Sequence, residues 1–163
     1  MATVAVIRDF DAEDFETLWR MDQECFPAGI AYSRHELNAF VRGKSSFTLV
    51  AVDEKSGVAE GFIVAHAGVS GHIITIDVAE RARRSGVGSQ LLRAAEERLR
   101  ARGALVVGLE AAVDNQAALA FYKRHGYSVI RTWPRYYSNG VDALVLSKSL
   151  DGSSARRTAK PRR

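Results

Sequence analysis

The stretch Arg83-Arg84-Ser85-Gly86-Val87-Gly88 joins two segments with different hydrophobic periods. The apolar run Ile73-Ile74-Thr75-Ile76-Asp77-Val78 precedes it and is typical of a buried strand. Apolar residues recur at helical spacing after it, at Leu91, Leu92, Ala95 and Leu99. The pattern predicts a strand, a tight turn and a helix. Glycines in such a turn leave main-chain N–H groups open at the positive end of the helix, where a diphosphate would bind.

Two common phosphate-binding loops do not fit this turn. A Walker loop needs Lys followed by Ser or Thr after its last glycine, but Ser89-Gln90 follows Gly88. A dinucleotide fingerprint needs a third glycine, and position 91 is a leucine. A tight turn with solvated arginines is the simpler alternative, which the hexamer alone leaves open.

Length and composition indicate one globular domain, expected over residues 1–150. The chain has 163 residues, of which 47% are hydrophobic and 26% charged. No apolar run approaches the roughly 20 residues that span a bilayer. The single cysteine, Cys25, permits no internal disulfide and fits a reducing compartment, so we expect a cytoplasmic protein without a membrane segment.

The basic charge is concentrated in a tail at residues 151–163. The whole chain carries a net charge of +4, and the tail holds five basic residues against Asp151. Its composition of Ser, Ala, Pro and Arg predicts a disordered segment. Contact with RNA or the ribosome is one interpretation of this tail, and a solvated extension is the other.

The remaining segments predict the element order βααβββαβαββ. Asp11 with Asp14, and Ser33 with Glu36, have the spacing of helix N-terminal caps. The strands before the glycine turn should form an antiparallel meander. The strand after the central helix should run parallel to the strand before it. Strands are expected at 3–8, 47–52, 60–67, 73–78, 104–110, 127–133 and 143–150.

The motif Arg83-x-x-Gly86-x-Gly88 resembles the acetyl-CoA pyrophosphate loop of the GNAT acetyltransferase superfamily. The predicted element order resembles the GNAT fold over nearly all of the first 150 residues. Segments 109–127 and 135–143 are similar to RimI-type N-terminal acetyltransferases, which modify the α-amine of a ribosomal protein. The resemblance implies an α/β (α+β) fold with a mixed, mostly antiparallel sheet and a splayed parallel strand pair.

The resemblance also implies how acetyl-CoA binds. Ile76 and Val78 would contact the pantetheine through their main chain, and Asn115 would reach it from the next helix, where helix capping is an equally good explanation. The diphosphate would lie on Arg83, Arg84, Ser85, Gly86, Val87, Gly88 and Ser89.

Two residues match the acid and base of the family. Glu110 resembles the RimI-type general base, and Tyr122 matches the tyrosine that protonates the leaving sulfur. A solvated carboxylate and a tyrosine at the edge of the core are the alternatives. His72 is a rival base, because an imidazole changes charge near neutral pH. The histidine spacing indicates no metal site.

The acceptor is expected to be an N-terminus with a small first residue. An α-amine has a pKa of roughly 7.7 to 8.0 and a lysine one of roughly 10.4, so a modest base suffices for the α-amine. One alternative acceptor is a small amine, such as a polyamine or an aminoglycoside. An alternative function is a non-catalytic acyl-CoA-binding module with an RNA-docking tail. The protein is expected to be a monomer or a homodimer. The loop departs from the RimI pattern at 28–30, where a tryptophan often occurs. The slot would be walled by Phe26, Pro27, Tyr32, Tyr136 and Tyr137.

Overall fold

The structure is a computed structural model and describes residues 5–151, so the predictions for the basic tail beyond Asp151 lie outside the described residues. The predicted element order is confirmed, with an additional 3-10 turn before the first and the third α-helix. The elements are β1 (Ala5–Asp9), η1 (Ala12–Asp14), α1 (Phe15–Cys25), α2 (Arg34–Val41), β2 (Ser46–Asp53), β3 (Ala59–His66), β4 (Ser70–Val78), η2 (Glu80–Ala82), α3 (Val87–Ala101), β5 (Val106–Ala112), α4 (Gln116–Arg124), β6 (Ser128–Trp133) and β7 (Ala143–Ser149).

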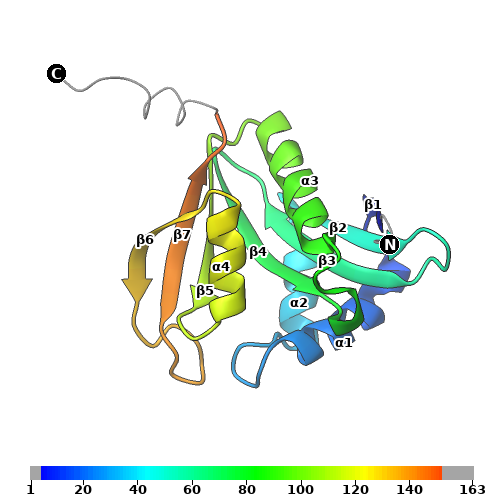
Figure 1. Cartoon of the computed structure of the whole chain (residues 1–163), viewed down its shortest axis with the longest axis horizontal. Helices are drawn as coiled ribbons and strands as arrows, with labels where there is room; N and C mark the ends of the chain where they lie inside the picture. Colours follow the sequence, from blue (N-terminus) through cyan, green and yellow to red (C-terminus); the bar gives the residue numbers. More distant parts are fainter. Residues whose placement is uncertain (1–4, 152–163) are drawn as a thin grey trace.

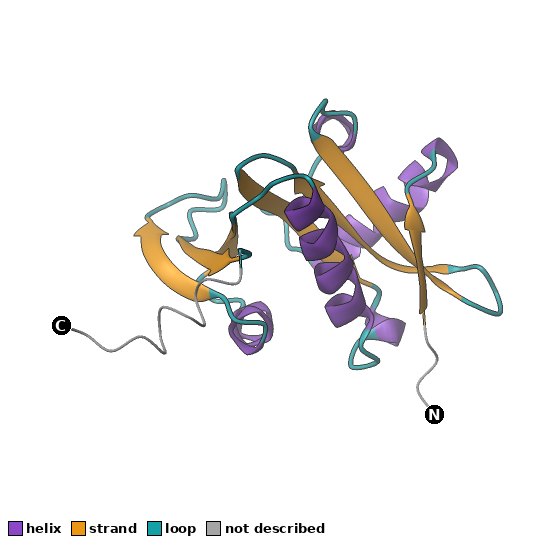
Figure 2. Cartoon of the chain, turned by 90° about the horizontal axis from the view of Figure 1, so that it is seen from above, coloured by secondary structure: helices purple, strands orange, loops and turns teal. Residues whose placement is uncertain are grey.

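One sheet holds all seven strands in the order β1-β2-β3-β4-β5-β7-β6. The strands β2, β3 and β4 form the predicted antiparallel meander, and β4 with β5 is the parallel pair. The helices α3 and α4 cover one face of the sheet, and α1 and α2 lie on the other (Figures 1 and 2). The fold class predicted from the sequence is therefore confirmed.

Each face of the sheet has its own hydrophobic core. The larger core joins α3 and α4 to the sheet and includes the fully buried Leu91, Leu92 and Leu99 of the predicted helical stripe. The second core lies under α1 and α2, around Leu18 and Leu37. A residue on a central strand therefore points to one helical layer or the other.

The parallel pair is short, and this feature positions the site. β4 pairs with β5 only from Ser70 to His72, opposite Val106 to Gly108. Beyond these residues β5 continues beside β7, while β4 continues beside β3, so the two strands diverge (Figure 1). The sheet thus has a gap between the far ends of β4 and β5, as a splayed pair requires.

The helix starts follow the predicted capping chemistry. Asp11 and Asp14 form a reciprocal capping box at the turn η1, which leads into α1, and Ser33 and Glu36 form another at the start of α2. The side chain of Asn115 accepts the N–H of Ala118 at the start of α4. No helix within residues 5–151 is long and apolar enough to cross a membrane.

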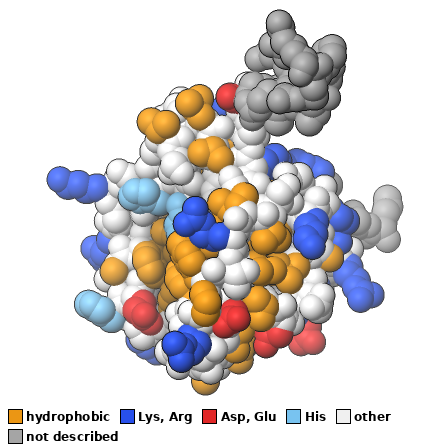
Figure 3. All heavy atoms as spheres, turned by 90° about the vertical axis from the view of Figure 1, so that its left-hand side faces the viewer, with side chains coloured by type: hydrophobic (Ala, Val, Ile, Leu, Met, Phe, Trp, Pro, Cys, Tyr) orange, Lys and Arg blue, Asp and Glu red, His pale blue; other side chains and the backbone are white. Residues whose placement is uncertain are grey.

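Strand β6 forms an edge of the sheet, and all of its residues are exposed. A bulge at Ile130 interrupts its pairing with β7, and Arg131 follows it. A bulge and a charge both oppose the addition of another strand to an edge. Apolar side chains gather on this side of the molecule (Figure 3), where the exposed ones include Val129, Ile130, Trp133 and Tyr136.

Candidate active site

The start of α3 offers a set of unpaired main-chain donors. The first helical bond runs from Gln90 N to Gly86 O at 3.0 Å, so the N–H groups of residues 87–89 have no partner within the helix. Gly86 has a φ of 89° and Arg84 a φ of 64°, both in the left-handed region. No side chain caps this helix. Such a turn presents N–H groups together to an anion, at the positive end of the helix dipole.

Gly88 packs against α4. A Cβ atom at this position would lie 3.4 Å from the ring of Phe121 on α4. Ser89 Oγ lies 2.9 Å from His125 Nε2, at the end of the same helix. The first turn of α3 and the face of α4 therefore contact each other directly.

The side chain of Arg83 bonds within the protein. Its Nε donates to the Val78 carbonyl at 3.1 Å, and its guanidinium lies 3.6 Å from Cys25 Sγ. The side chain thus closes the end of β4. Arg84 is exposed in the turn itself.

Ile76 and Val78 lie on β4 beyond the last residue that pairs with β5. A bulge precedes them, because Val64 pairs with Thr75 and Ala65 with Ile73, which leaves Ile74 as the extra residue. The Ile74 carbonyl accepts a hydrogen bond from the Tyr32 hydroxyl at 3.3 Å. This segment of β4 therefore borders the gap with an irregular main chain.

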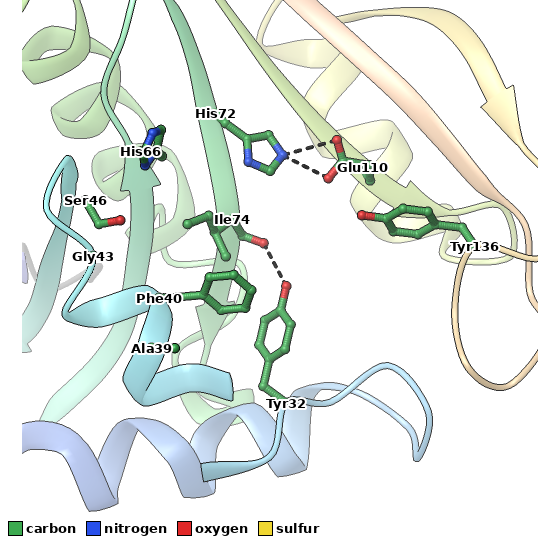
Figure 4. A pocket seen from close by; sticks show the side chains of 10 residues that line it. All are labelled: Tyr32, Ala39, Phe40, Gly43, Ser46, His66, His72, Ile74, Glu110 and Tyr136. Carbon is green, nitrogen blue, oxygen red and sulfur yellow. Dashed lines mark hydrogen bonds and ion pairs between the residues drawn. The ribbon is translucent and has the colours of Figure 1, made fainter. Parts of the chain in front are cut away.

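A pocket of about 400 Å³ lies on the α1/α2 side of the gap. Its lining comes from α2, from strands β2 to β5 and from the loops before α2 and after β6 (Figure 4). One wall is apolar and aromatic, and the other carries the titratable side chains. The lining residues are Tyr32, Ala39, Phe40, Gly43, Ser46, His66, His72, Ile74, Glu110 and Tyr136.

His72 and Glu110 form an ion pair or hydrogen bond in this pocket. His72 Nε2 lies 2.9 Å from Glu110 Oε1 and 3.1 Å from Oε2 (Figure 4). The Glu110 side chain is 15% exposed and that of His72 40% exposed. The two residues proposed as rival bases are therefore partners, and both face the pocket.

Tyr122 lies on the opposite side of the sheet from this pair. It belongs to the core under α3 and α4, whereas the pocket opens on the α1/α2 side. Its hydroxyl makes no hydrogen bond to a described residue. Burial, with a smaller effect of Asp77, raises the pKa of Tyr122 above its ordinary value. Tyr122 therefore stays protonated and suits the role of a proton donor rather than a base.

The two loops expected to wall the slot touch each other. Ser138 Oγ donates to the Gly29 carbonyl at 2.9 Å, and Asn139 packs so closely on Gly29 that a Cβ there would lie 2.7 Å from it. Tyr32 and Tyr136 line the pocket from these loops. The other predicted wall residues, Phe26, Pro27 and Tyr137, are not among the lining residues.

The sequence did not identify several lining residues. No motif in the sequence marks His66, Ser46 or Phe40 as a site residue. Ser46 begins the apolar strand β2 and His66 ends the apolar strand β3. Only the register of the sheet, which pairs these two residues, shows that they lie side by side. Across residues 5–151 no group of three or more metal-ligating side chains occurs.

Comparison with known proteins decides the family. The family described as "Acetyltransferase (GNAT) family" matches residues 13–127. The chain belongs to the GNAT acetyltransferase family. It is an N-acetyltransferase, as the sequence predicted, and the acetyl donor of this family is acetyl-CoA.

GNAT relatives match most of the chain. N-alpha-acetyltransferase 30 of Schizosaccharomyces pombe is 32% identical over 119 residues, which are 69% of this chain and 78% of that protein. The crystal structure of Ard1 from Thermoplasma volcanium is 30% identical, with a TM-score of 0.82 over 90% of this chain and 97% of that one. The ribosomal-protein-S18-alanine N-acetyltransferase of Escherichia coli shares the fold, with 21% identity and a TM-score of 0.77 over 90% of this chain and 94% of that one.

The GNAT cofactor fits the residues that this chain provides. The uncapped N-terminus of α3, with Gly86 in a left-handed conformation and no atom within 4 Å of a Cβ placed there, leaves room for a phosphate group at the main chain. The strands β4 and β5, which diverge beyond His72 and Gly108, carry Glu110 on one side of the gap, and the loop before α3 follows the end of β4 on the other.

Proposed function

We propose that this protein acetylates the α-amine of a protein N-terminus by direct attack in a ternary complex with acetyl-CoA. The observation that carries the proposal is the pair of His72 and Glu110, 2.9 Å apart, in a pocket on one side of the gap between β4 and β5. The donor loop at the start of α3 lies on the other side. An amine that enters the pocket would therefore meet an acyl carbon held in the gap.

Most of the residues that hold acetyl-CoA in this proposal are among those that the sequence indicated. The N–H groups from Gly86 to Ser89 would bind the diphosphate, with Arg84 adding charge. Ile76 and the N–H of Val78 would bind the pantetheine, because the Val78 carbonyl is already occupied by Arg83. Asn115 would act first as the cap of α4.

The chemistry uses a base and an acid from opposite faces of the sheet. Glu110, held by His72, would take the proton of the amine, directly or through a water molecule, as the nitrogen forms a bond to the acyl carbon. The bond between carbon and sulfur then breaks, and the Tyr122 hydroxyl would return a proton to the sulfur. Each proton transfer thus has a separate group in a fixed place.

Cys25 does not suit a covalent acetyl carrier, although it lies beside the gap. Its Sγ is 3.5 Å from the Val78 carbonyl, and burial raises its pKa to about 11. A thiol with this pKa is neutral at physiological pH and is a poor nucleophile. Direct transfer from acetyl-CoA to the amine is therefore the better mechanism.

The shape and charge of the pocket support an N-terminal acceptor. The loops of Gly29 and Ser138 close against each other, so a chain end would enter between them more easily than a lysine within a chain. Among the described lining residues Glu110 is the one carboxylate, which gives a polyamine no further counter-charge. The α-amine is also free far more often than a lysine amine at neutral pH. The name of the Schizosaccharomyces pombe relative agrees with this acceptor.

We include a small first residue, such as the alanine or serine of a ribosomal protein, in this proposal. Tyr32 and Tyr136 stand on the two loops that face the pocket, and such a narrow entrance favours a small side chain. A cytoplasmic place of action follows from the same acceptor, since ribosomal proteins are made there.

The test uses peptides that offer both kinds of amine. A peptide with a free Ala N-terminus and one internal lysine is incubated with acetyl-CoA, beside the same peptide with a blocked N-terminus, and mass spectrometry locates the acetyl group. We expect acetylation of the α-amine and none of the blocked peptide. Faster acetylation of the lysine, of spermidine or of an aminoglycoside would overturn the proposal.

A further inference from the structure

The first turn of α3 and the end of α4 share a hydrogen bond. Ser89 Oγ lies 2.9 Å from His125 Nε2. The imidazole packs on Phe121, whose ring centroid lies 4.7 Å from its own, and Phe121 in turn lies against Gly88. Ser89 and His125 are both half-buried. His125 is therefore held with one ring nitrogen on the loop proposed to bind the diphosphate.

Ser89 is the third residue of α3, so it belongs to the donor loop. Its main-chain N–H is among those that have no partner within the helix. Its hydroxyl has one proton to donate, and the hydroxyl oxygen lies on His125. Whether this proton can reach a ligand therefore depends on the protonation state of His125.

The protonation of His125 decides the role of the Ser89 hydroxyl. A neutral imidazole with a bare Nε2 accepts the proton of the hydroxyl, which then has none to offer to an anion. An imidazolium carries a proton on both nitrogens, so Nε2 donates to Ser89 Oγ instead. The hydroxyl proton is then available to a diphosphate oxygen. Protonation thus adds a hydrogen-bond donor and a positive charge beside the loop.

The charges around His125 oppose its protonation when no anion is bound. The charged groups that face it are Arg93 and Glu96 of α3, Arg124 of α4 and Lys148 of β7. Glu96, the acid among them, is paired with Lys148 at 2.8 Å. Burial, and next the charge of Arg93, lower the pKa of His125 below its ordinary value. A diphosphate beside the ring would raise this pKa again, because an opposite charge favours the imidazolium.

We propose that His125 takes up a proton from solvent when acetyl-CoA binds, and that the imidazolium frees the Ser89 hydroxyl to donate to the diphosphate. His125 is a positioning residue in this role, because it acts on the ligand through Ser89. The inference rests on the place given to the diphosphate in the proposed function. It goes beyond that function by making the affinity for the cofactor depend on pH.

The affinity should fall as the pH rises. Because the pKa of His125 is higher in the complex than in the free protein, the added affinity is complete below the pKa of the free protein. It is lost as the pH rises through the pKa of the complex. Coenzyme A also carries a 3′-phosphate, and such a monoester loses its second proton near pH 6. Dephospho-coenzyme A lacks this group but keeps the diphosphate, so it is the suitable probe.

The experiment measures the Kd of dephospho-coenzyme A for the full-length protein by calorimetry at about pH 5.5 and about pH 8, on either side of an ordinary histidine pKa. We expect an affinity about tenfold higher at the lower pH, the factor that corresponds to one pKa unit. His125→Gln keeps an amide beside Ser89 but cannot titrate, so its affinity should change by less than about twofold. Ser89→Ala should show a smaller pH effect than the unmodified protein, because the charge of His125 remains without the hydroxyl. His35→Gln removes an exposed histidine of α2 and should keep the tenfold effect.

The outcomes separate this inference from the proposals on which it depends. Equal affinities at the two pH values, or a tenfold difference that persists in His125→Gln, overturn the role of His125. A full tenfold effect in Ser89→Ala overturns the part of the hydroxyl. Normal affinity in Gly86→Ala at both pH values would overturn the place of the diphosphate itself. No acceptor amine is present in these measurements, so none of the results decides the proposed N-terminal acceptor.

Discussion

Asp22 of α1 and Asp77 of β4 hold two carboxyl groups against each other in the interior, at 0% and 1% exposure. Asp22 Oδ2 accepts the N–H of Tyr32 and Asp77 Oδ1 accepts the hydroxyl of Thr75, both at 2.7 Å. The other oxygen of each group has no donor in the described residues, so a proton must be held between them. The pair joins the loop of Tyr32 to the strand that borders the gap.

Asp77 is the partner that keeps the proton. Burial, and next the charge of Asp22, raise the pKa of Asp77 well above its ordinary value. An unfolded aspartate ionises near 3.8. The stabilisation from protonated Asp77 is therefore complete below that pH and is lost as the pH rises toward the folded pKa.

The Asp77→Asn variant should remove this dependence on pH. An amide keeps an acceptor for Thr75 and a donor for Asp22, so it imitates the protonated acid. We expect the free energy of unfolding of Asp77→Asn to rise relative to the unmodified protein as the pH increases above about 4. Urea unfolding at several pH values measures this difference. If the free energies of unfolding of the two proteins changed with pH in parallel, the shared proton would be contradicted. Asp77→Ala, which loses both bonds, should be less stable by about 1–3 kcal/mol.

The pair of Glu110 and His72 predicts unequal effects of two conservative variants. If Glu110 is the base, Glu110→Gln should lower kcat by about 10² to 10⁴-fold. His72→Asn should lower it less, because the carboxylate remains. Steady-state kinetics with an Ala peptide measures both, with His35→Asn as the control. A larger loss in His72→Asn than in Glu110→Gln would make His72 the base.

Tyr122 and Tyr127 lie in the same core, and their phenylalanine variants should differ, one in turnover and the other in stability. Tyr122 has no hydrogen bond to lose within residues 5–151, so Tyr122→Phe should keep its stability and lower kcat by about 10²-fold, with the KM for acetyl-CoA little changed. Tyr127 donates to buried Glu96 at 2.7 Å. Tyr127→Phe should therefore lose about 1–3 kcal/mol of stability and keep its rate. An unchanged kcat in Tyr122→Phe would leave that residue a packing role alone.

The sequence predicted those features that depend on neighbours in the chain. The glycine turn before α3, the two capping boxes and the order of elements along the chain follow from local spacing and hydrophobic period. The partnership of His72 with Glu110 depends on the register of β4 and β5, and a shift by one residue would turn one side chain to the other face. The sequence therefore presented these two residues as rivals.

The Asp77 carboxylate illustrates the same limit. An aspartate within the apolar run before the turn is visible in the sequence, but its partner Asp22 is on a helix much earlier in the chain. The bulge at Ile74 was also beyond local reasoning, because it is defined by the pairing with β3. Contacts of this kind come from the packing of whole elements, which local sequence patterns do not encode.

The donor loop can be tested with the two glycines at the ends of α3. Gly86 and Gly103 have φ angles of 89° and 95°, and neither has an atom within 4 Å of a Cβ placed on it. Alanine at either position should cost about 1–2 kcal/mol of stability through the left-handed backbone. Only Gly86→Ala adds a methyl group beside the N–H groups proposed to bind the diphosphate.

Calorimetry with coenzyme A should therefore show an affinity at least about tenfold weaker in Gly86→Ala and unchanged in Gly103→Ala, although thermal unfolding shows similar losses in both. Equal stability losses make Gly103→Ala the matched control, because strain alone would then weaken binding equally in the two variants. Normal affinity for coenzyme A in Gly86→Ala would mean that the diphosphate lies away from the start of α3. A methyl group at this position would otherwise interfere with the contact between the diphosphate and the main-chain N–H groups.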